Sequence, residues 1–153
     1  MKILIAVDGS ESSDVAVEDV SKRPWPADSA VRIISVAETL PLEVLSLPPR
    51  YREEIERAAR HRAETTVERV MARIRDSDAR IFPISSTVVM DSPKDAIVEE
   101  AERWGADLIV VGSHGYRGTE RALLGSVSQA VATQAKCSVE IARRRHVDYD
   151  EEC

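Results

Sequence analysis

Residues Asp107–Ser126, with the sequence DLIVVGSHGYRGTERALLGS, set the architecture of this chain. After the aspartate, residues 108–111 are apolar and mostly β-branched, which is typical of a strand buried on both faces. From Val127 onward the apolar residues recur at helical spacing, so Ser126 stands at a helix start. The stretch therefore predicts a buried strand, a glycine-bearing loop and the N-terminus of a helix.

The predicted loop has the composition of an anion-binding loop. Glycines let the backbone approach an anion closely and reach positive φ at little cost. The helix start offers unpaired backbone N–H groups and the positive end of the helix dipole, and Ser126 adds a hydroxyl donor. A phosphate site is favoured on these grounds over a glycine-rich connection that binds nothing.

The rest of the chain alternates predicted strands with predicted helices, which indicates a single α/β domain. Its parallel sheet is expected to be covered by helices on both faces, with right-handed crossovers. Ligands of such folds bind at the carboxyl ends of the strands, where the strand order reverses. Pro83 in the third strand predicts an edge position, because proline cannot donate to a central ladder. The strands are expected at 2–7, 30–36, 80–89, 107–111 and 136–142, and the helices at 12–21, 51–76, 93–104 and from 126.

Composition narrows the class of protein. The 153 residues fit one domain, and the net charge of −6 without a basic stripe argues against nucleic-acid binding. No apolar run approaches membrane-spanning length and the N-terminus does not resemble a signal peptide, so a cytoplasmic protein is expected. The two cysteines support no disulfide framework: Cys137 is expected in the core and Cys153 at an exposed end.

The segment 37–50 departs from the alternation. It holds three prolines and a group of apolar residues that should pack against another surface, as a lid, a dimer contact or an ordered flap. A packed connector without a further role is an equally open interpretation. The apolar residues are Leu40, Leu42, Val44, Leu45 and Leu47.

The glycines of the loop form a longer pattern. Gly112, Gly115, Gly125 and Ser126 are spaced as Gly-x2-Gly-x9-Gly-Ser. This spacing resembles the ATP-binding signature of the universal stress protein family at all four positions, and the opening sequence ILIAVDGS at 3–10 is similar as well. The resemblance implies strand order 3-2-1-4-5 and an adenine nucleotide α-hydrolase-like fold.

The resemblance covers nearly the whole chain. It implies a family domain over residues 1–143 and a charged tail over 144–153. The ligand that it implies is ATP, or ADP or AMP, with Mg²⁺ or Mn²⁺ accompanying the nucleotide. Asp8, at the end of the first strand, is the candidate metal ligand.

The resemblance also implies a set of nucleotide contacts. In ATP-binding members the aspartate after the first strand contacts the nucleotide or its metal, and Asp8 stands there. On its residues alone, Asp8 is better explained as a turn former in Asp-Gly-Ser. Val36, which ends the second strand, is similar to the family's backbone contact to adenine. The other implied contacts are Gly112 and Gly115, lining ribose and phosphates, and Gly125, Ser126 and Val127, donating N–H groups to phosphates.

Three further side chains of the loop can carry positive charge. Arg117 and Arg121 could pair with phosphate, for which a guanidinium is well suited, and are explained equally well as exposed loop arginines. His114 lies between the first two glycines. Because no second base or nucleophile stands beside it in sequence, a loop or interface histidine is favoured over a general acid.

The closing strand at 137–142 is the expected homodimer contact, since the family's strand typically pairs with its counterpart across a two-fold axis. The family commonly has proline where Ser138 stands and an apolar residue where Glu140 stands. Glu140 would therefore approach a like charge or need a partner such as Arg143 or Arg144.

Three functions stay open at this point. The favoured one is an ATP-binding cytoplasmic stress-response protein that works as a nucleotide-dependent switch or sensor, with at most slow ATP turnover. The second is a dimeric interaction protein of the same type with no functional nucleotide. The third is a nucleotide-using hydrolase or transferase, against which the lack of a Ser-Gly-Gly loop or a His-x-Gly-His sequence counts. A downstream protein partner is not implied.

Overall fold

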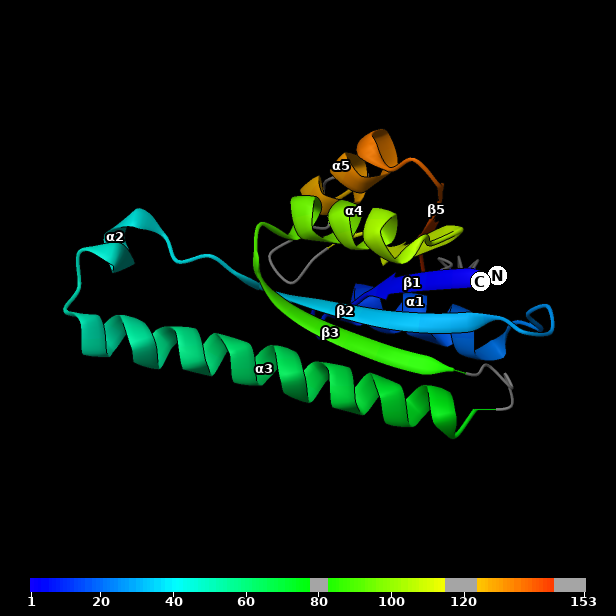
Figure 1. Ribbon diagram of the computed structural model, residues 1–153, viewed down its shortest axis with the longest axis horizontal. Helices are drawn as coiled ribbons and strands as arrows, with labels where there is room; N and C mark the ends of the chain where they lie inside the picture. Colours follow the sequence, from blue (N-terminus) through cyan, green and yellow to red (C-terminus); the bar gives the residue numbers. More distant parts are fainter. Residues whose placement is uncertain (78–82, 115–123, 145–153) are drawn as a thin grey trace, which may run out of the picture.

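The apolar strands pair into one parallel sheet in the order β3-β2-β1-β4-β5, as expected (Figure 1). This computed structural model describes residues 1–77, 83–114 and 124–144. Its strands are β1 (Lys2–Ala6), β2 (Ala30–Glu38), β3 (Ile84–Asp91), β4 (Leu108–Gly112) and β5 (Ser138–Ala142). Its helices are α1 (Glu11–Lys22), α2 (Leu42–Leu45), α3 (Pro49–Arg75), α4 (Pro93–Trp104) and α5 (Ser126–Gln134).

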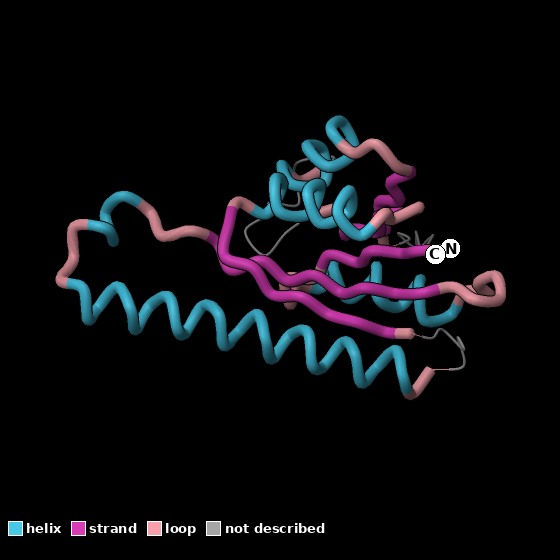
Figure 2. Tube along the Cα trace, viewed as in Figure 1, coloured by secondary structure: helices cyan, strands magenta, loops and turns pink. Residues whose placement is uncertain are grey.

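Helices cover both faces of the sheet (Figure 2). Successive side chains of a strand point to opposite faces, and β1 shows the consequence. Ile3 and Ile5 join the core under α1 and α3, while Leu4 joins the core under α4 and α5, and all three are 0% exposed. Burial on both faces explains why β1 shows no alternation of polar and apolar residues.

Two local signals in the sequence agree with the structure: Gly105, which directly follows the helix expected at 93–104, and Pro83. α4 ends at Gly105, whose φ of 74° is the left-handed conformation that a glycine after a helix commonly adopts. β3 lies at an edge of the sheet, as Pro83 predicted. Pro83 itself lies directly before β3 rather than within it, and its carbonyl accepts from the N–H of Val31 at 3.1 Å. The strand begins at Ile84, and residues 78–82 are outside the described part of the chain.

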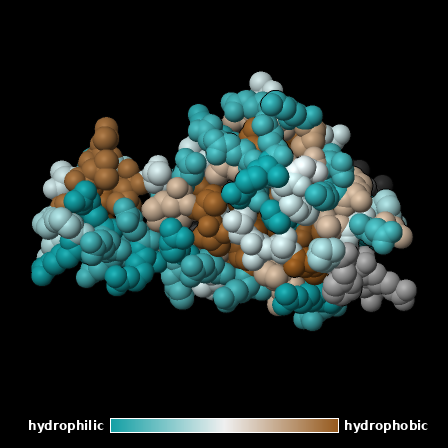
Figure 3. Space-filling view, viewed as in Figure 1, coloured by the Kyte–Doolittle hydropathy of each residue, from teal (hydrophilic) through white to brown (hydrophobic). Residues whose placement is uncertain are grey.

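α2 and the first turns of α3 project beyond the sheet as an arm (Figure 1). Leu42 is 82% exposed, and Leu45, Leu47, Tyr51 and Ile55 are exposed as well. Figure 3 shows the resulting apolar surface at this end of the molecule. Because α2 lies past the end of the sheet, these three leucines stay exposed in the single chain, and the lid, dimer contact or flap expected for 37–50 stays a prediction.

Cys137 lies just before β5, half-buried against the core under α4 and α5, as expected. Burial raises the pKa of its thiol. Among the described helices, none is long and apolar enough to cross a membrane.

Candidate functional site

The strand register gathers the predicted contacts at one edge of the sheet. The register pairs Ala6 with Ile34 and Ile5 with Val110, so Asp8, Val36 and Gly112 each lie two residues beyond the last paired residue of their segment. This edge is the carboxyl end of the strands, and the strand order reverses between β1 and β4. It is the position at which doubly wound α/β folds bind ligands.

β2 continues past the end of β1 at this edge. Its residues 35–38 pair with β3, whereas the register with β1 stops at Ile34. The N–H of Val7 donates to the carbonyl of Ile34 at 2.9 Å. The backbone groups of Val36, two residues on, face the same side of β2 because the strand repeats every two residues. Val36 thus presents its N–H and carbonyl to the space beyond β1, as a backbone contact to a base requires.

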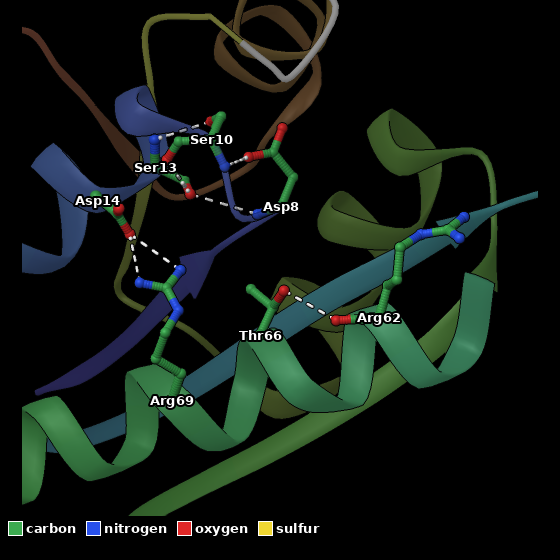
Figure 4. A network of polar contacts seen from close by, with 7 residues as sticks. All are labelled: Asp8, Ser10, Ser13, Asp14, Arg62, Thr66 and Arg69. Atoms are coloured by element: carbon green, nitrogen blue, oxygen red, sulfur yellow. Dashed lines mark hydrogen bonds and ion pairs between the residues drawn. The ribbon is translucent and has the colours of Figure 1, made fainter. Parts of the chain in front are cut away.

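Asp8, Gly9 and Ser10 make a tight turn between β1 and α1 (Figure 4). Oδ1 of Asp8 accepts from the N–H of Ser10 at 2.9 Å, and Gly9 has a φ of 81°. Oγ of Ser10 caps α1 by accepting from the N–H of Ser13 at 3.2 Å. Asp8 therefore holds the turn that its residue type suggested. The residue is also exposed, so its carboxylate is accessible to a ligand.

Gly112 ends β4 directly against the first turn of α1. A Cβ at this position would lie 2.6 Å from the backbone C and O of Ser12, closer than unbonded atoms approach. Glycine is therefore required here so that α1 can pack on β4. This packing requirement comes in addition to the ligand contact that the sequence predicted for Gly112.

Serines outside the glycine pattern close the base of the loop. Oγ of Ser12 accepts from the N–H of His114 at 3.0 Å and lies 3.3 Å from Oγ of Ser113. The Ser113 hydroxyl lies 3.0 Å from Nδ1 of His114. The Ser113 carbonyl accepts from the N–H of Gly125 at 2.7 Å and from the hydroxyl of Ser128 at 3.1 Å. Sequence reasoning missed all three serines, because serine carries no positional signal outside caps and turns.

These contacts restrict which amides can meet an anion. The N–H of Gly125 is used within the protein, although the sequence predicted that it would donate to phosphate. α5 begins at Ser126, and its N-cap makes no side-chain hydrogen bond. The N–H groups of Ser126 and Val127 belong to the first turn of α5, where the helix itself offers no acceptor. Ser126 is exposed and Val127 half-buried.

Three predicted contacts, Gly115, Arg117 and Arg121, lie outside the described residues. His114 lies half-buried at the start of the loop, hydrogen-bonded to serine hydroxyls. In the described ranges, no group of three or more His, Cys, Asp and Glu side chains could hold a metal ion.

β5 forms the second edge of the sheet, and its Glu140 has a partner within the chain. Arg23, directly after α1, donates to both carboxylate oxygens of Glu140 at 2.7 and 2.6 Å, and its guanidinium lies 4.9 Å from the Trp25 ring. The expected partner, Arg143 or Arg144, was wrong. Glu140 turns toward the sheet face that α1 covers, so the end of α1 supplies the cation.

Arg23→Gln should change how the free energy of unfolding depends on pH in the acid range. The hydrogen bonds from Arg23 lower the pKa of Glu140, so the pair stabilises the fold above the ordinary glutamate pKa of about 4.3. That contribution is lost as the pH falls through the lowered pKa. Because the side chains are 37% and 31% exposed, we expect at most about 1 kcal/mol. Urea unfolding of both proteins across this range should show a difference at neutral pH that vanishes in acid, and a constant difference would contradict the assignment.

Comparison with known proteins places the chain among its relatives. The model of the universal stress protein family matches residues 1–143. Universal stress protein Rv2005c of Mycobacterium tuberculosis is 33% identical over 146 residues, which cover 93% of this chain and 45% of that relative. The chain therefore spans less than half the length of this relative.

Solved structures show the same fold. Universal stress protein MJ0577 of Methanocaldococcus jannaschii is 25% identical, with a TM-score of 0.83 over 95% of this chain and 96% of the other. A universal stress protein in complex with cAMP is 24% identical, with a TM-score of 0.67 over 95% and 98% of the two chains. Because the family model matches nearly the whole chain and the observed sheet has the order that the family implies, this chain belongs to the universal stress protein family.

Proposed function

We propose that this protein binds an adenine nucleotide between the ends of β1 and β4 and works as a nucleotide-dependent switch or sensor. One observation carries the proposal: the N-terminus of α5 opens at the sheet edge that also presents Asp8 and the backbone of Val36. The amides of Ser126 and Val127 and the helix dipole suit a phosphate. The N–H and carbonyl of Val36 suit the paired acceptor and donor of an adenine edge.

Three further parts of the proposal follow from this placement. Asp8 would supply a carboxylate to a Mg²⁺ or Mn²⁺ that arrives with the phosphates, and the ion would offset the phosphate charge. Gly115, Arg117 and Arg121 would contribute from the loop. The nucleotides to test here are ATP, ADP and AMP, which the family resemblance implies, and cAMP, which the structural relative binds.

Ser126→Pro is expected to weaken nucleotide binding by more than about tenfold, because it removes an amide that donates to a charged phosphate. Proline fits the first helical position, and Gly125 before it has an extended conformation, φ −70° and ψ 161°, that proline tolerates. The helix should therefore persist. Calorimetric titration with each nucleotide, with and without Mg²⁺, measures the change.

Ser126→Ala is the matched control, because it removes the hydroxyl and keeps the amide. It should cost no more than about threefold in affinity. Equal binding by the proline variant and the wild type would show that phosphate does not lie at the start of α5. A folded wild type that binds none of the nucleotides would overturn the proposed function.

An interaction role is the second candidate, and the exposed leucines of α2 favour it, since exposed apolar patches commonly mark protein contacts. We also propose a homodimer through β5, whose outer edge is open to a further strand within the described residues. Light scattering over a concentration series should give twice the monomer mass. A constant monomer mass at high concentration would refute the dimer.

A further inference from the structure

We propose that Ser12 is a positioning residue for the nucleotide site. Its hydroxyl ties the first amide of the glycine loop to α1 and so fixes where the loop leaves the sheet. Ser12 lies outside the Gly-x2-Gly-x9-Gly-Ser pattern, and 102 positions separate it from His114. The inference rests on the proposed function, because the site that it positions is the nucleotide site.

Ser12 has no capping task of its own in α1. The cap is Ser10, whose side chain accepts from Ser13. The hydroxyl of Ser12 is directed instead at the end of β4, where it accepts from the N–H of His114 at 3.0 Å and lies 3.3 Å from the Ser113 hydroxyl. Its contacts in the described chain thus join α1 to the start of the loop.

The close packing of α1 on β4 fixes the position of the contact between the Ser12 hydroxyl and the His114 amide. The backbone of Ser12 fills the space that a side chain at Gly112 would need, at 2.6 Å from an ideal Cβ. Oγ of the same serine lies 2.7 Å from that Cβ position. A backbone packed this closely has little freedom to slide. The Ser12 hydroxyl therefore holds the amide of His114 at one place relative to β4.

The same helical turn also holds Asp8. Oδ1 of Asp8 accepts from the N–H of Ser10 at 2.9 Å, and the N–H of Asp8 points at the hydroxyl of Ser13, 3.5 Å away (Figure 4). The first turn of α1 thus connects to the end of β1 through Ser10 and Ser13, and to the end of β4 through Ser12. It links the two halves of the proposed site.

Ser12 also influences which amides remain for a phosphate. The N–H of His114 is bound to Ser12 at the start of the loop, and the N–H of Gly125 is bound to Ser113 at its end. Ser12→Ala removes this acceptor from the amide of the half-buried His114, and the loss of a backbone hydrogen bond costs free energy. His114 and Ser113 would then be held less firmly, and the Ser113 carbonyl binds Gly125 directly before α5, so the donors at the start of α5 would lose their alignment with the rest of the site.

Two variants and a control test the proposal. Ser12→Ala should raise the Kd for the bound nucleotide about fivefold, the usual effect of one neutral hydrogen bond. Ser12→Thr keeps the hydroxyl and should restore most of the affinity. Thr133→Ala removes a side-chain bond to the Gln129 carbonyl on α5, away from the site, and should leave binding unchanged. Thermal unfolding of each variant separates a loss of affinity from a loss of folding.

Amide exchange measured by NMR supplies a second readout that needs no ligand. The His114 amide should exchange faster in the Ser12→Ala protein than in the wild type and the Thr133→Ala protein. If the wild type binds nucleotide and the Ser12→Ala protein binds it equally well, the role of Ser12 is overturned. An unchanged exchange rate of the His114 amide in Ser12→Ala would overturn it as well. A wild type without nucleotide affinity would overturn the proposed function alone, and the exchange rate would still decide whether Ser12 anchors the loop.

Discussion

Gly112→Ala should destabilise the fold by about 3 kcal/mol, at the upper end of the usual cost of overpacking. The new Cβ would meet the backbone C and O of Ser12 at 2.6 Å. Those atoms belong to the first turn of α1, so relief requires a shift of the whole helix or of the end of β4. The same shift would pull the His114 amide away from Ser12, and nucleotide binding should be lost with the stability.

The control for this prediction is Gly105→Ala. Gly105 has a φ of 74°, and its Cβ would approach Lys2 Nζ at 3.9 Å, which is ordinary contact. Its cost is therefore the strain of a left-handed residue, about 1 kcal/mol. In urea unfolding, the free energy of unfolding of Gly112→Ala should be well below that of Gly105→Ala. The reverse order would refute the packing role of Gly112.

Arg32→Ala is the second change with a large expected effect. Nη1 of Arg32 lies 2.8 Å from Oε1 of Glu100, whose side chain is only 3% exposed. Arg32 also donates from Nε to the Ser85 hydroxyl at 3.0 Å and lies 4.8 Å from the Trp104 ring. Removing the Arg32 guanidinium leaves the buried Glu100 carboxylate paired with Arg103, whose side chain is 70% exposed. We expect a loss of about 3 kcal/mol, the usual cost of breaking a buried ion pair.

Two controls separate this effect from simple loss of charge. Arg103 is 70% exposed, so Arg103→Ala should cost no more than about 1 kcal/mol. The double variant Arg32→Met with Glu100→Leu removes both charges of the pair and should recover much of the stability lost in Arg32→Ala. Equal unfolding free energies for the alanine variants at 32 and 103 would show that the Arg32 pair does not protect a buried charge.

The two predictions concern contacts that join distant segments, and neither contact was visible in the amino-acid pattern. The sequence indicated a ligand-binding role for Gly112. The structure adds a steric requirement for glycine at this position, because the backbone of Ser12 on α1 packs against it. Glu140 seemed to need Arg143 or Arg144 nearby, yet its partner Arg23 stands 117 positions away. Likewise, the amide of Gly125 seemed available to phosphate until the fold placed it against the Ser113 carbonyl.

Much of the fold could be read without coordinates, because its signals are local. A run of β-branched residues favours a strand wherever it occurs, and helical spacing of apolar residues from Val127 onward predicts α5. Gly105 after a helix predicts a left-handed end, and Pro83 predicts an edge strand. Each of these patterns depends only on residues that are close together in the sequence. The strand order came from the family resemblance, since alternation alone does not specify it.

The arm shows the limit of local signals. An apolar stripe along α3 predicts a helix with one buried face, and its later residues, Ala63, Val67, Val70 and Ile74, are buried. The stripe does not reveal where the sheet ends, so the exposure of Ile55 and of the leucines in α2 could not be foreseen. Periodicity thus specifies the elements, their faces and their caps. The sheet register and the lengths of the elements set which distant side chains and amides meet, because these contacts depend on distances in space that no local pattern encodes.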